Sequence, residues 1–342
     1  MVQKQIVVYG ASGHTGRFVV AELVRRGWQP ILSGRDAAKL QVVADSHGGL
    51  EVRAAGIEAP ADLDRALLGA AAVVNCAGPF AWTSAPLVEA ALRARIPYLD
   101  IAAEVEAVAD TLSHHDAAAR AAGIPVISAM AFYGGLGDLL AAAVVPAGWE
   151  RVDRIELGYW LDSWAPTPGT RASGAVSSGR RAGRRVVYRD GGLRYLDDAG
   201  PEPVAHTFPR PVGTRQVLPE FTMTDCVTIG RRLDVGAIDS FMSLAAVADL
   251  RDAATPPPRS ADGSGRSAQQ FLVEVVARAG SEERRIHAAG RDIYAVTGPI
   301  VVEAVERVLA GRYVGTGTLT AGQAFDARSF LQALPLTALQ EA

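Results

Sequence analysis

The chain has 342 residues, of which 49% are hydrophobic and 21% are charged. This composition predicts one or two globular domains and excludes a disordered or fibrous chain. The net charge of -3 gives no global field for nucleic acid, and no apolar run approaches the roughly 20 residues that span a bilayer. Two scattered cysteines, and an N-terminus that enters a strand without a cleavable leader, indicate a cytoplasmic protein.

The first predicted element is a β-branched apolar strand at residues 5–9, followed by a helix with apolar periodicity at residues 15–26. The turn between them carries glycines in the pattern G-x-x-G-x-x-G. The first glycine permits a tight turn, the second lets backbone amides approach a pyrophosphate, and the third lets the helix pack close to the sheet. The helix N-terminus would then bind the phosphates. The predicted cofactor contacts in this loop are Gly10, Ser12, Gly13, His14, Thr15 and Gly16.

The second predicted strand, residues 30–36, lacks the terminal carboxylate that binds the ribose of NAD. It carries Ser33 and Arg35 instead. A guanidinium can pair bidentately with a 2′-phosphate, and the serine hydroxyl can add a hydrogen bond. We therefore expect NADPH to be preferred over NADH. Two alternatives stay open, because Asp36 can reach the ribose and Arg35 can stack on adenine.

Strands and helices continue to alternate up to residue 129. The further strands are predicted at residues 52–54, 71–75, 98–101 and 124–129, and the helices at residues 62–68, 86–94 and 105–122. Repeated βα units of this length predict an α/β fold with a Rossmann-type, doubly wound parallel sheet.

The pattern changes after Pro146. We predict a strand at residues 154–161, a small-residue helix at 169–183, hairpins at 186–196 and 271–289, and a returning helix at 300–310. This predicts a second, α+β domain with a mixed or antiparallel sheet. The expected division is residues 1–130 plus 293–342 for the dinucleotide-binding domain and residues 131–292 for the substrate or dimerisation domain. The cleft between them would hold the active site.

These segments resemble the saccharopine dehydrogenase-like group of NAD(P)-dependent oxidoreductases, which includes saccharopine reductases and trans-acting enoyl reductases. The likeness is good over the first 145 residues and the last 50, and weak between them. It rests on the stretches GASGHTGR with SGRD, VVNCAGPF, PLVEAALRARIPYLDIAAE, AFYGGLGDLLA and GTGTLTAGQAFDARSFLQAL.

The resemblance implies that VVNCAGPF lies against the nicotinamide half of the cofactor. Its small residues would let the dinucleotide pass at the carboxyl edge of the sheet, where ligands bind in open α/β folds. The predicted cofactor contacts here are Cys76, Ala77, Gly78 and Pro79. Cys76 is either a nucleophile or, more commonly for a free cysteine, a small buried side chain.

The catalytic candidates are Tyr98, Asp100, Glu104 and Asp138. Asp100 and Glu104 would place two carboxylates near the nicotinamide, where they can orient a cationic substrate or supply a proton. The alternatives are a helix-capping Asp100, a solvated Glu104 and an Asp138 that serves as an N-cap. In saccharopine reductases the residue matching Asp138 faces the substrate, although the turn that begins at Tyr133 departs from their Asp-Pro-Gly.

Substrate contacts are predicted for aromatic side chains near the domain boundary and in the second domain: Phe80, Tyr133, Trp160 and Trp164, with Tyr159 beside them. Core packing is the alternative. A basic cluster in the second domain can dock an acyl carrier domain or form a solvated face; it consists of Arg180, Arg181, Arg184 and Arg185.

The sequence excludes several mechanisms. Lys4 and Lys39 are the only lysines, and neither forms a Tyr-x-x-x-Lys pair or suits a Schiff base. The six histidines have no metal-ligand spacing, so we predict no metal. The cofactor itself carries hydride chemistry. We therefore predict an NADPH-dependent reductase of a C=N or activated C=C bond in a small molecule.

Two other functions stay open. The chain can be a trans-acting enoyl reductase on a carrier-bound, polyketide-type intermediate, or an NADP(H)-binding sensor without activity. A homodimer is expected by analogy with similar folds.

Overall fold

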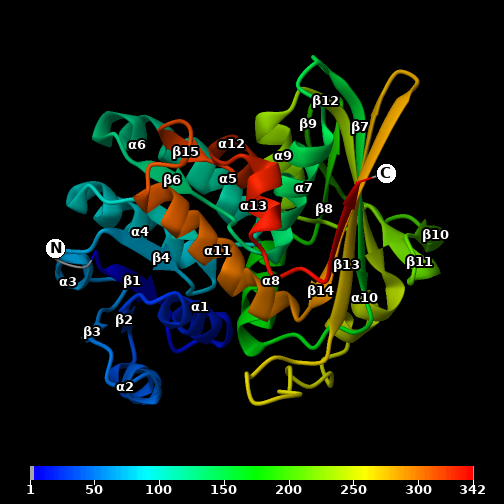
Figure 1. The fold of residues 1–342 in the computed structure, drawn as a ribbon. Coiled ribbons are helices and arrows are strands. Elements are labelled where there is room, and N and C mark those ends of the chain that lie inside the picture. The colour runs from blue at the N-terminus through cyan, green and yellow to red at the C-terminus, as the bar shows by residue number, and fades with distance from the viewer. Residues whose placement is uncertain (1–3, 342) are drawn as a thin grey trace.

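The computed structural model describes residues 4–341 and shows two sheets, each flanked by helices (Figure 1). The first sheet has seven parallel strands in the order β15-β6-β5-β4-β1-β2-β3. Most of its strands are apolar and buried along their length, as expected for a parallel sheet covered on both faces. The strands are β1 (Ile6–Tyr9), β2 (Ile31–Gly34), β3 (Val52–Ala54), β4 (Ala72–Asn75), β5 (Tyr98–Asp100), β6 (Pro125–Ile127) and β15 (Gly317–Leu319).

The helices associated with this sheet are α1 (His14–Arg25), α2 (Ala37–Ser46), α3 (Pro60–Leu67), α4 (Phe80–Ala94), α5 (Val105–His114), α6 (Asp116–Ala122) and α11 (Ile293–Leu309). The sequence did not predict α2, and three of the predicted helices differ clearly in extent. The helix expected over residues 105–122 is interrupted at His115, where φ is -106° and ψ is -2°. Both α4 and α11 begin earlier than expected and contain an internal proline, Pro86 and Pro299. A proline removes one hydrogen bond of a helix and does not fix where the helix begins.

The second sheet is mixed, because β12 runs parallel to β7 while its other strand pairs are antiparallel. Its main path is β10-β11-β12-β7-β13-β14-β16, with β8 on β12 and β9 on β8. Both predicted hairpins, β8–β9 and β13–β14, are confirmed. The strands are β7 (Val152–Leu161), β8 (Arg185–Arg189), β9 (Gly192–Leu196), β10 (Val204–Phe208), β11 (Gly213–Pro219), β12 (Val235–Ser243), β13 (Gln270–Ala279), β14 (Glu282–Arg291) and β16 (Ala338–Glu341).

The remaining helices are α7 (Gly137–Val144), α8 (Pro168–Arg180), α9 (Asp225–Arg232), α10 (Leu244–Arg251), α12 (Ala321–Ala324) and α13 (Ala327–Gln332). The predicted fold class, a Rossmann-type sheet with a second α+β domain, is confirmed. The C-terminal segment differs from the expected division, because β15 joins the first sheet and β16 joins the second.

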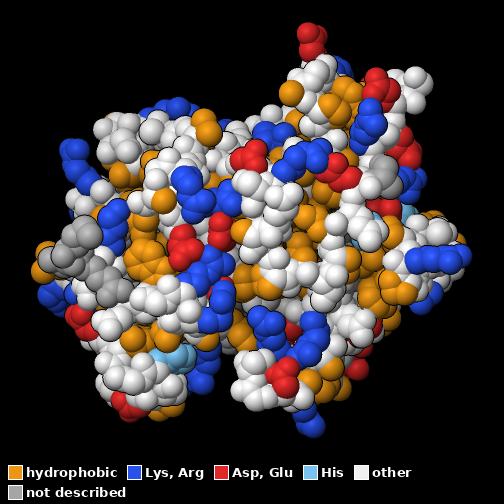
Figure 2. All heavy atoms as spheres, in the orientation of Figure 1, with side chains coloured by type: hydrophobic (Ala, Val, Ile, Leu, Met, Phe, Trp, Pro, Cys, Tyr) orange, Lys and Arg blue, Asp and Glu red, His pale blue; other side chains and the backbone are white. Residues whose placement is uncertain are grey.

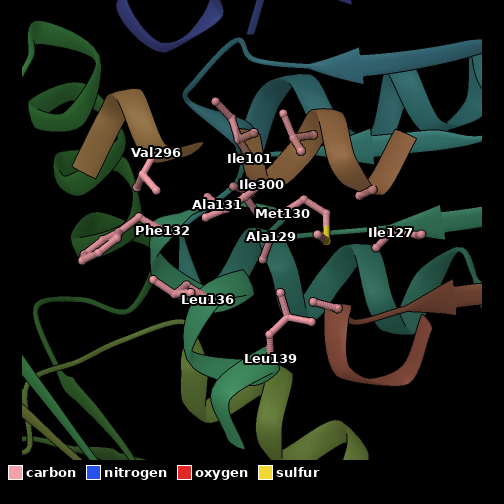
Figure 3. Close-up of a cluster of buried hydrophobic side chains, with 14 of the residues drawn as sticks. Ile101, Ile127, Ala129, Met130, Ala131, Phe132, Leu136, Leu139, Val296 and Ile300 are labelled. Atoms are coloured by element: carbon pink, nitrogen blue, oxygen red, sulfur yellow. The ribbon is translucent and has the colours of Figure 1, made fainter. Parts of the chain in front are cut away.

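The two sheets are joined by a buried apolar cluster around the turn that follows β6. Figure 3 shows residues of this turn, Ala129 to Phe132, packed between α11 and α7. Val296 and Ile300 contribute from α11, and Leu139 contributes from α7. The turn after β6 is therefore held by both parts of the molecule. On the face in Figure 2, acidic and basic side chains are interspersed rather than gathered by sign.

Candidate functional site

The glycine loop has the shape that a dinucleotide requires. Gly10 has a φ of 82°, and a Cβ atom there would lie 2.8 Å from the amide nitrogen of Ala77. A Cβ atom at Gly16 would lie 2.2 Å from the carbonyl oxygen of Gly10. These two glycines therefore bring the loop close to strand four and the helix close to the loop.

The N-terminus of α1 is open to an anion. Its N-cap is Gly13, which has no side chain to cap the helix, and the first turn carries no acidic residue. Ser12 and Thr15 are half-buried in the same loop. Backbone amides at such a terminus and the helix dipole together favour a phosphate. The residues present therefore fit the pyrophosphate of a dinucleotide.

At the end of β2, the structure assigns different tasks to the three polar residues. Ser33 is fully buried, and its hydroxyl donates to the carbonyl oxygen of Arg53 at 2.8 Å. The carboxylate of Asp36 accepts from the amide of Lys39 at 3.1 Å and thereby caps α2. This backbone hydrogen bond lowers the pKa of Asp36. Arg35 is exposed and makes no ion pair within residues 4–341, so its guanidinium is free to bind a phosphate.

The loop after β4 is fixed by the buried amide of Asn75. Its Nδ2 donates to Tyr98 Oη at 3.1 Å, and its Oδ1 accepts from the amide of Ala77 at 3.0 Å. Cys76 is half-buried, and the low polarity around its thiol raises its pKa well above the usual range. A thiol that stays protonated is a poor nucleophile, so a nucleophilic Cys76 is not supported.

Helix α8 of the second sheet's domain covers this loop. A Cβ atom at Gly78 would lie 2.6 Å from Ser173 Oγ on α8. Gly78 is joined by a cis peptide bond to Pro79, which is the N-cap of α4. Phe80 follows as a buried residue at the start of α4. The loop expected beside the nicotinamide therefore lies between the two parts of the molecule.

Asp100 is a structural anchor in this arrangement. It is fully buried, and its oxygens accept from the amides of Ala102 at 3.0 Å and Ala129 at 2.7 Å, and from the hydroxyls of Ser128 and Tyr98. Burial raises its pKa, and these hydrogen bonds oppose the rise. Ala129 has a φ of 62°, which is unfavourable for a residue with a Cβ. Asp100 ends a strand and caps no helix, and it stabilises the turn after β6.

Glu104 has a different task from either one predicted for it. Its side chain is 4% exposed, so the solvated alternative is wrong. One carboxylate oxygen accepts from the amide of Phe80 at 2.7 Å, and the other accepts from that of Ala81 at 3.0 Å. These are the first two residues of α4, whose N-cap has no side-chain hydrogen bond of its own. Glu104 therefore caps α4 from a distance and complements its dipole.

The carboxylate of Asp138 also accepts hydrogen bonds from other groups of the chain. It is fully buried, and it accepts from the amide of Gly322 at 2.7 Å while Arg232 Nε lies 3.5 Å away. The N-cap of α7 is Leu136, so the N-cap alternative for Asp138 is wrong. The carboxylate joins α7 to α9 and to the C-terminal segment.

The predicted aromatic wall is divided between two faces of the second sheet. The Tyr133 ring lies 5.3 Å from the ring of Trp164 and 5.4 Å from that of Tyr159. Trp160 follows Tyr159 directly on β7, so its side chain points to the opposite face. There it packs against a separate cluster that includes Phe208. Trp160 is therefore not brought together with Tyr133.

Tyr294 is a residue that the sequence analysis did not single out. Its hydroxyl contacts the second domain, and its ring contacts the glycine loop. The hydroxyl accepts from Trp164 Nε1 at 3.2 Å and hydrogen-bonds to Thr170 Oγ1 at 3.0 Å. Its ring lies 5.1 Å from the ring of His14, at the first residue of α1. Burial lowers the pKa of His14, so its imidazole is neutral at neutral pH.

Asp225 is a second residue that the sequence did not reveal. It is fully buried at the start of α9, where Tyr159 Oη donates to it at 2.8 Å and the amide of Gly134 donates at 3.2 Å. Burial raises its pKa to about 6. The segment around it has neither a recognisable motif nor clear periodicity, so no signal marked it.

The arginine cluster forms ion pairs within the chain. Arg180 pairs with Asp110 at 2.6 Å. Arg181 lies 3.6 Å from Glu106, which also accepts from Ser177 Oγ at 2.5 Å. These contacts fasten α8 to α5. Arg185 pairs with Asp198 and Glu220, and Arg184 lies over the ring of Tyr195.

No group of three or more histidine, cysteine, aspartate or glutamate side chains is arranged to hold a metal ion within residues 4–341. No helix in the same range combines the length and apolarity needed to cross a bilayer.

Comparisons with known proteins fit this geometry. The family described as "Saccharopine dehydrogenase NADP binding domain" matches residues 6–127. The human saccharopine dehydrogenase-like oxidoreductase is 30% identical over an alignment of 148 residues, with a coverage of 37% of this chain and 34% of that protein. The rat protein of the same name is 32% identical over an alignment of 118 residues, with a coverage of 29% of this chain and 28% of that protein. The matched region thus spans about a third of the length of these relatives.

A solved structure extends the likeness to the fold as a whole. The apo saccharopine dehydrogenase (L-Glu forming) of Saccharomyces cerevisiae has a TM-score of 0.67, covering 99% of both chains at 12% sequence identity. At that identity the likeness concerns the fold alone. The resemblance inferred from the sequence is therefore confirmed: residues 6–127 match the saccharopine dehydrogenase NADP-binding domain, and the chain shares the fold of the yeast enzyme.

Proposed function

We propose that the chain is an NADPH-dependent reductase that transfers hydride to a C=N or activated C=C bond of a small molecule. The supporting observation is the open N-terminus of α1 beside Arg35, which makes no ion pair with the residues that the structure describes. The amides of the first turn of α1 would hold the pyrophosphate, and Arg35 would hold the 2′-phosphate. Bound NADPH supplies the hydride, and the residues of the chain orient it and the substrate.

The hydrogen bond and the ion pair of the Asp36 carboxylate support a preference for NADPH over NADH. A carboxylate that accepts the ribose 2′-hydroxyl selects NADH, but this one caps α2 and pairs with Lys39 Nζ at 3.2 Å. Arg35 remains as the group able to discriminate between the two cofactors. A carrier-bound substrate is not part of the proposal, because the arginines expected to dock a carrier are engaged within the chain.

The test is a cofactor titration on the Arg35→Ala variant. Loss of a charged hydrogen bond to phosphate is expected to weaken NADPH binding roughly ten- to a hundredfold and to leave NADH binding unchanged. Arg215→Ala is the matched control, since this exposed arginine lies on β11 in the second sheet. Equal losses for both cofactors would refute the role of Arg35.

Activity requires a separate measurement, because a non-catalytic sensor would also bind NADPH. Loss of NADPH absorbance with any member of a panel of cyclic imines and enones supports the reductase. Tight NADPH binding with no oxidation across the panel would favour the sensor.

A further inference from the structure

The hydroxyl of Tyr133 is buried and has no hydrogen-bond partner within the described residues. Two other buried tyrosines differ in this respect. Tyr98 donates to Asp100, and Tyr159 donates to Asp225. An enclosed polar group without a partner costs about 1–3 kcal/mol, so a hydroxyl kept in this condition points to a partner outside the chain.

The position of Tyr133 suits a ligand. It follows β6 in the turn whose backbone Asp100 holds, and Gly134 after it has a φ of 86°. The strands β6, β5 and β4 lie on one side of β1, while β2, which Arg35 follows, lies on the other. Ligands of parallel sheets bind beyond the carboxyl ends of the strands. Tyr133 is thus placed toward the end of the site away from the adenosine.

Aromatic rings connect Tyr133 to the cofactor loop. Its ring packs on Trp164, whose Nε1 donates to Tyr294, and the Tyr294 ring packs on His14 beside the glycines. Phe132 covers another side of Tyr133, with ring centroids 4.8 Å apart. The Tyr133 ring therefore belongs to a chain of aromatic side chains that connects the glycine loop to the second sheet.

The phenol of Tyr133 is uncharged, although ionisable groups lie near it. Burial, and then the fields of Tyr294 and Asp225, raise the pKa of Tyr133 well above its usual value, so the phenol remains a neutral donor. Asp100, Glu104, Asp138 and Asp225 all have oxygens that accept hydrogen bonds from groups of the chain. A neutral phenol can donate a hydrogen bond to a carbonyl oxygen, whereas the nitrogen of an iminium ion has no lone pair to accept one.

Within the reductase function proposed above, we propose that the Tyr133 hydroxyl donates a hydrogen bond to the carbonyl oxygen of an uncharged α,β-unsaturated carbonyl substrate. Hydride from NADPH forms the new C–H bond at the β-carbon, and the C=C electrons move to the carbonyl, giving an enolate and NADP⁺. The negative charge collects on the oxygen that Tyr133 faces. A proton from water then adds to the α-carbon, and the tyrosine keeps its own proton.

The test uses Tyr133→Phe and the aldehyde 4-(dimethylamino)cinnamaldehyde. The absorption of this conjugated aldehyde moves to longer wavelength when its carbonyl oxygen accepts a hydrogen bond. With NADP⁺ present, which cannot give hydride, the wild type is expected to shift the absorption and Tyr133→Phe to lose the shift. Tyr195→Phe is the control, since Tyr195 is 39% exposed on β9 and should keep the shift.

Thermal unfolding supplies a second readout. Because the Tyr133 hydroxyl has no partner within the described residues, Tyr133→Phe should not lower the unfolding midpoint. A lowered midpoint would show a partner inside the chain and overturn the proposal. An equal shift in wild type and variant, or no shift in the wild type, would also overturn it. Failure of the wild type to bind NADPH would instead remove the reductase function itself.

Discussion

Replacing Asp225 with asparagine should stabilise the protein at neutral pH and remove one step of its pH dependence. The side chain is enclosed by Tyr159 from β7, the amide of Gly134, Asp138 from α7 and Cys226 on its own helix. An asparagine can keep both hydrogen bonds. Its oxygen accepts from Gly134, and its Nδ2 donates to Tyr159, whose hydroxyl can rotate to accept.

The magnitude follows from the pKa of Asp225, which burial raises from 3.8 to about 6. Between these values the carboxyl is protonated in the folded state and ionised in the unfolded state. The folded state thus binds more protons, and its stability falls as pH rises from about 4 to about 6. At about 1.4 kcal/mol per pKa unit, the wild type loses about 3 kcal/mol over this range, while asparagine does not titrate.

Urea unfolding of both proteins at several pH values between 4 and 8 measures this difference. The free energy of unfolding of Asp225→Asn minus that of the wild type should grow by about 3 kcal/mol across the range. Taking the difference cancels the other buried carboxyls, including Asp100, whose pKa is also raised by burial. A difference that stays constant with pH would refute the assignment of this titration to Asp225.

Two further substitutions test the packing that supports the site. Gly137→Ala should lower the free energy of unfolding by about 1–3 kcal/mol in urea, because its Cβ atom would lie 2.0 Å from an Asp225 oxygen. The control is Gly148→Ala, whose Cβ atom would have no atom within 4 Å and which should leave the free energy of unfolding unchanged. Equal effects of the two substitutions would contradict the clash. Glu104→Gln should lower the stability of the fold by about 1–3 kcal/mol in thermal unfolding, because a single side-chain oxygen then remains to accept from two amides of α4. An unchanged unfolding midpoint would show that the cap is dispensable.

The nucleotide-binding half was predictable because its signals are local. The glycine loop lies between an apolar strand and a periodic helix, and each feature occupies adjacent residues. The roles of the carboxylates were not predictable in the same way. Glu104 caps a helix that begins 24 residues earlier, and Asp138 accepts from Gly322, 184 residues later. Such partners are set by tertiary packing, of which a single sequence carries no direct record.

The aromatic residues of β7 are an intermediate case. The prediction grouped Tyr159 with Trp160, although the period of a strand places consecutive side chains on opposite faces and could have separated them. Which of the two faces the first domain depends on how the sheets pack. The structure settles this by placing Tyr133 against Tyr159.

In the function proposed above, different parts of this chain would recognise the cofactor and the substrate, and this limits what similarity can reveal. The family match ends at residue 127, before Tyr133, Trp164 and Asp225. Those three residues come from the turn after β6, the segment before α8 and the start of α9, and they contact or face one another across the second sheet's domain. Relatives that share only the nucleotide-binding domain can therefore share the cofactor and differ in substrate. A relative that lacks the Tyr133 hydroxyl is expected to differ in the carbonyl contact while it still binds NADPH.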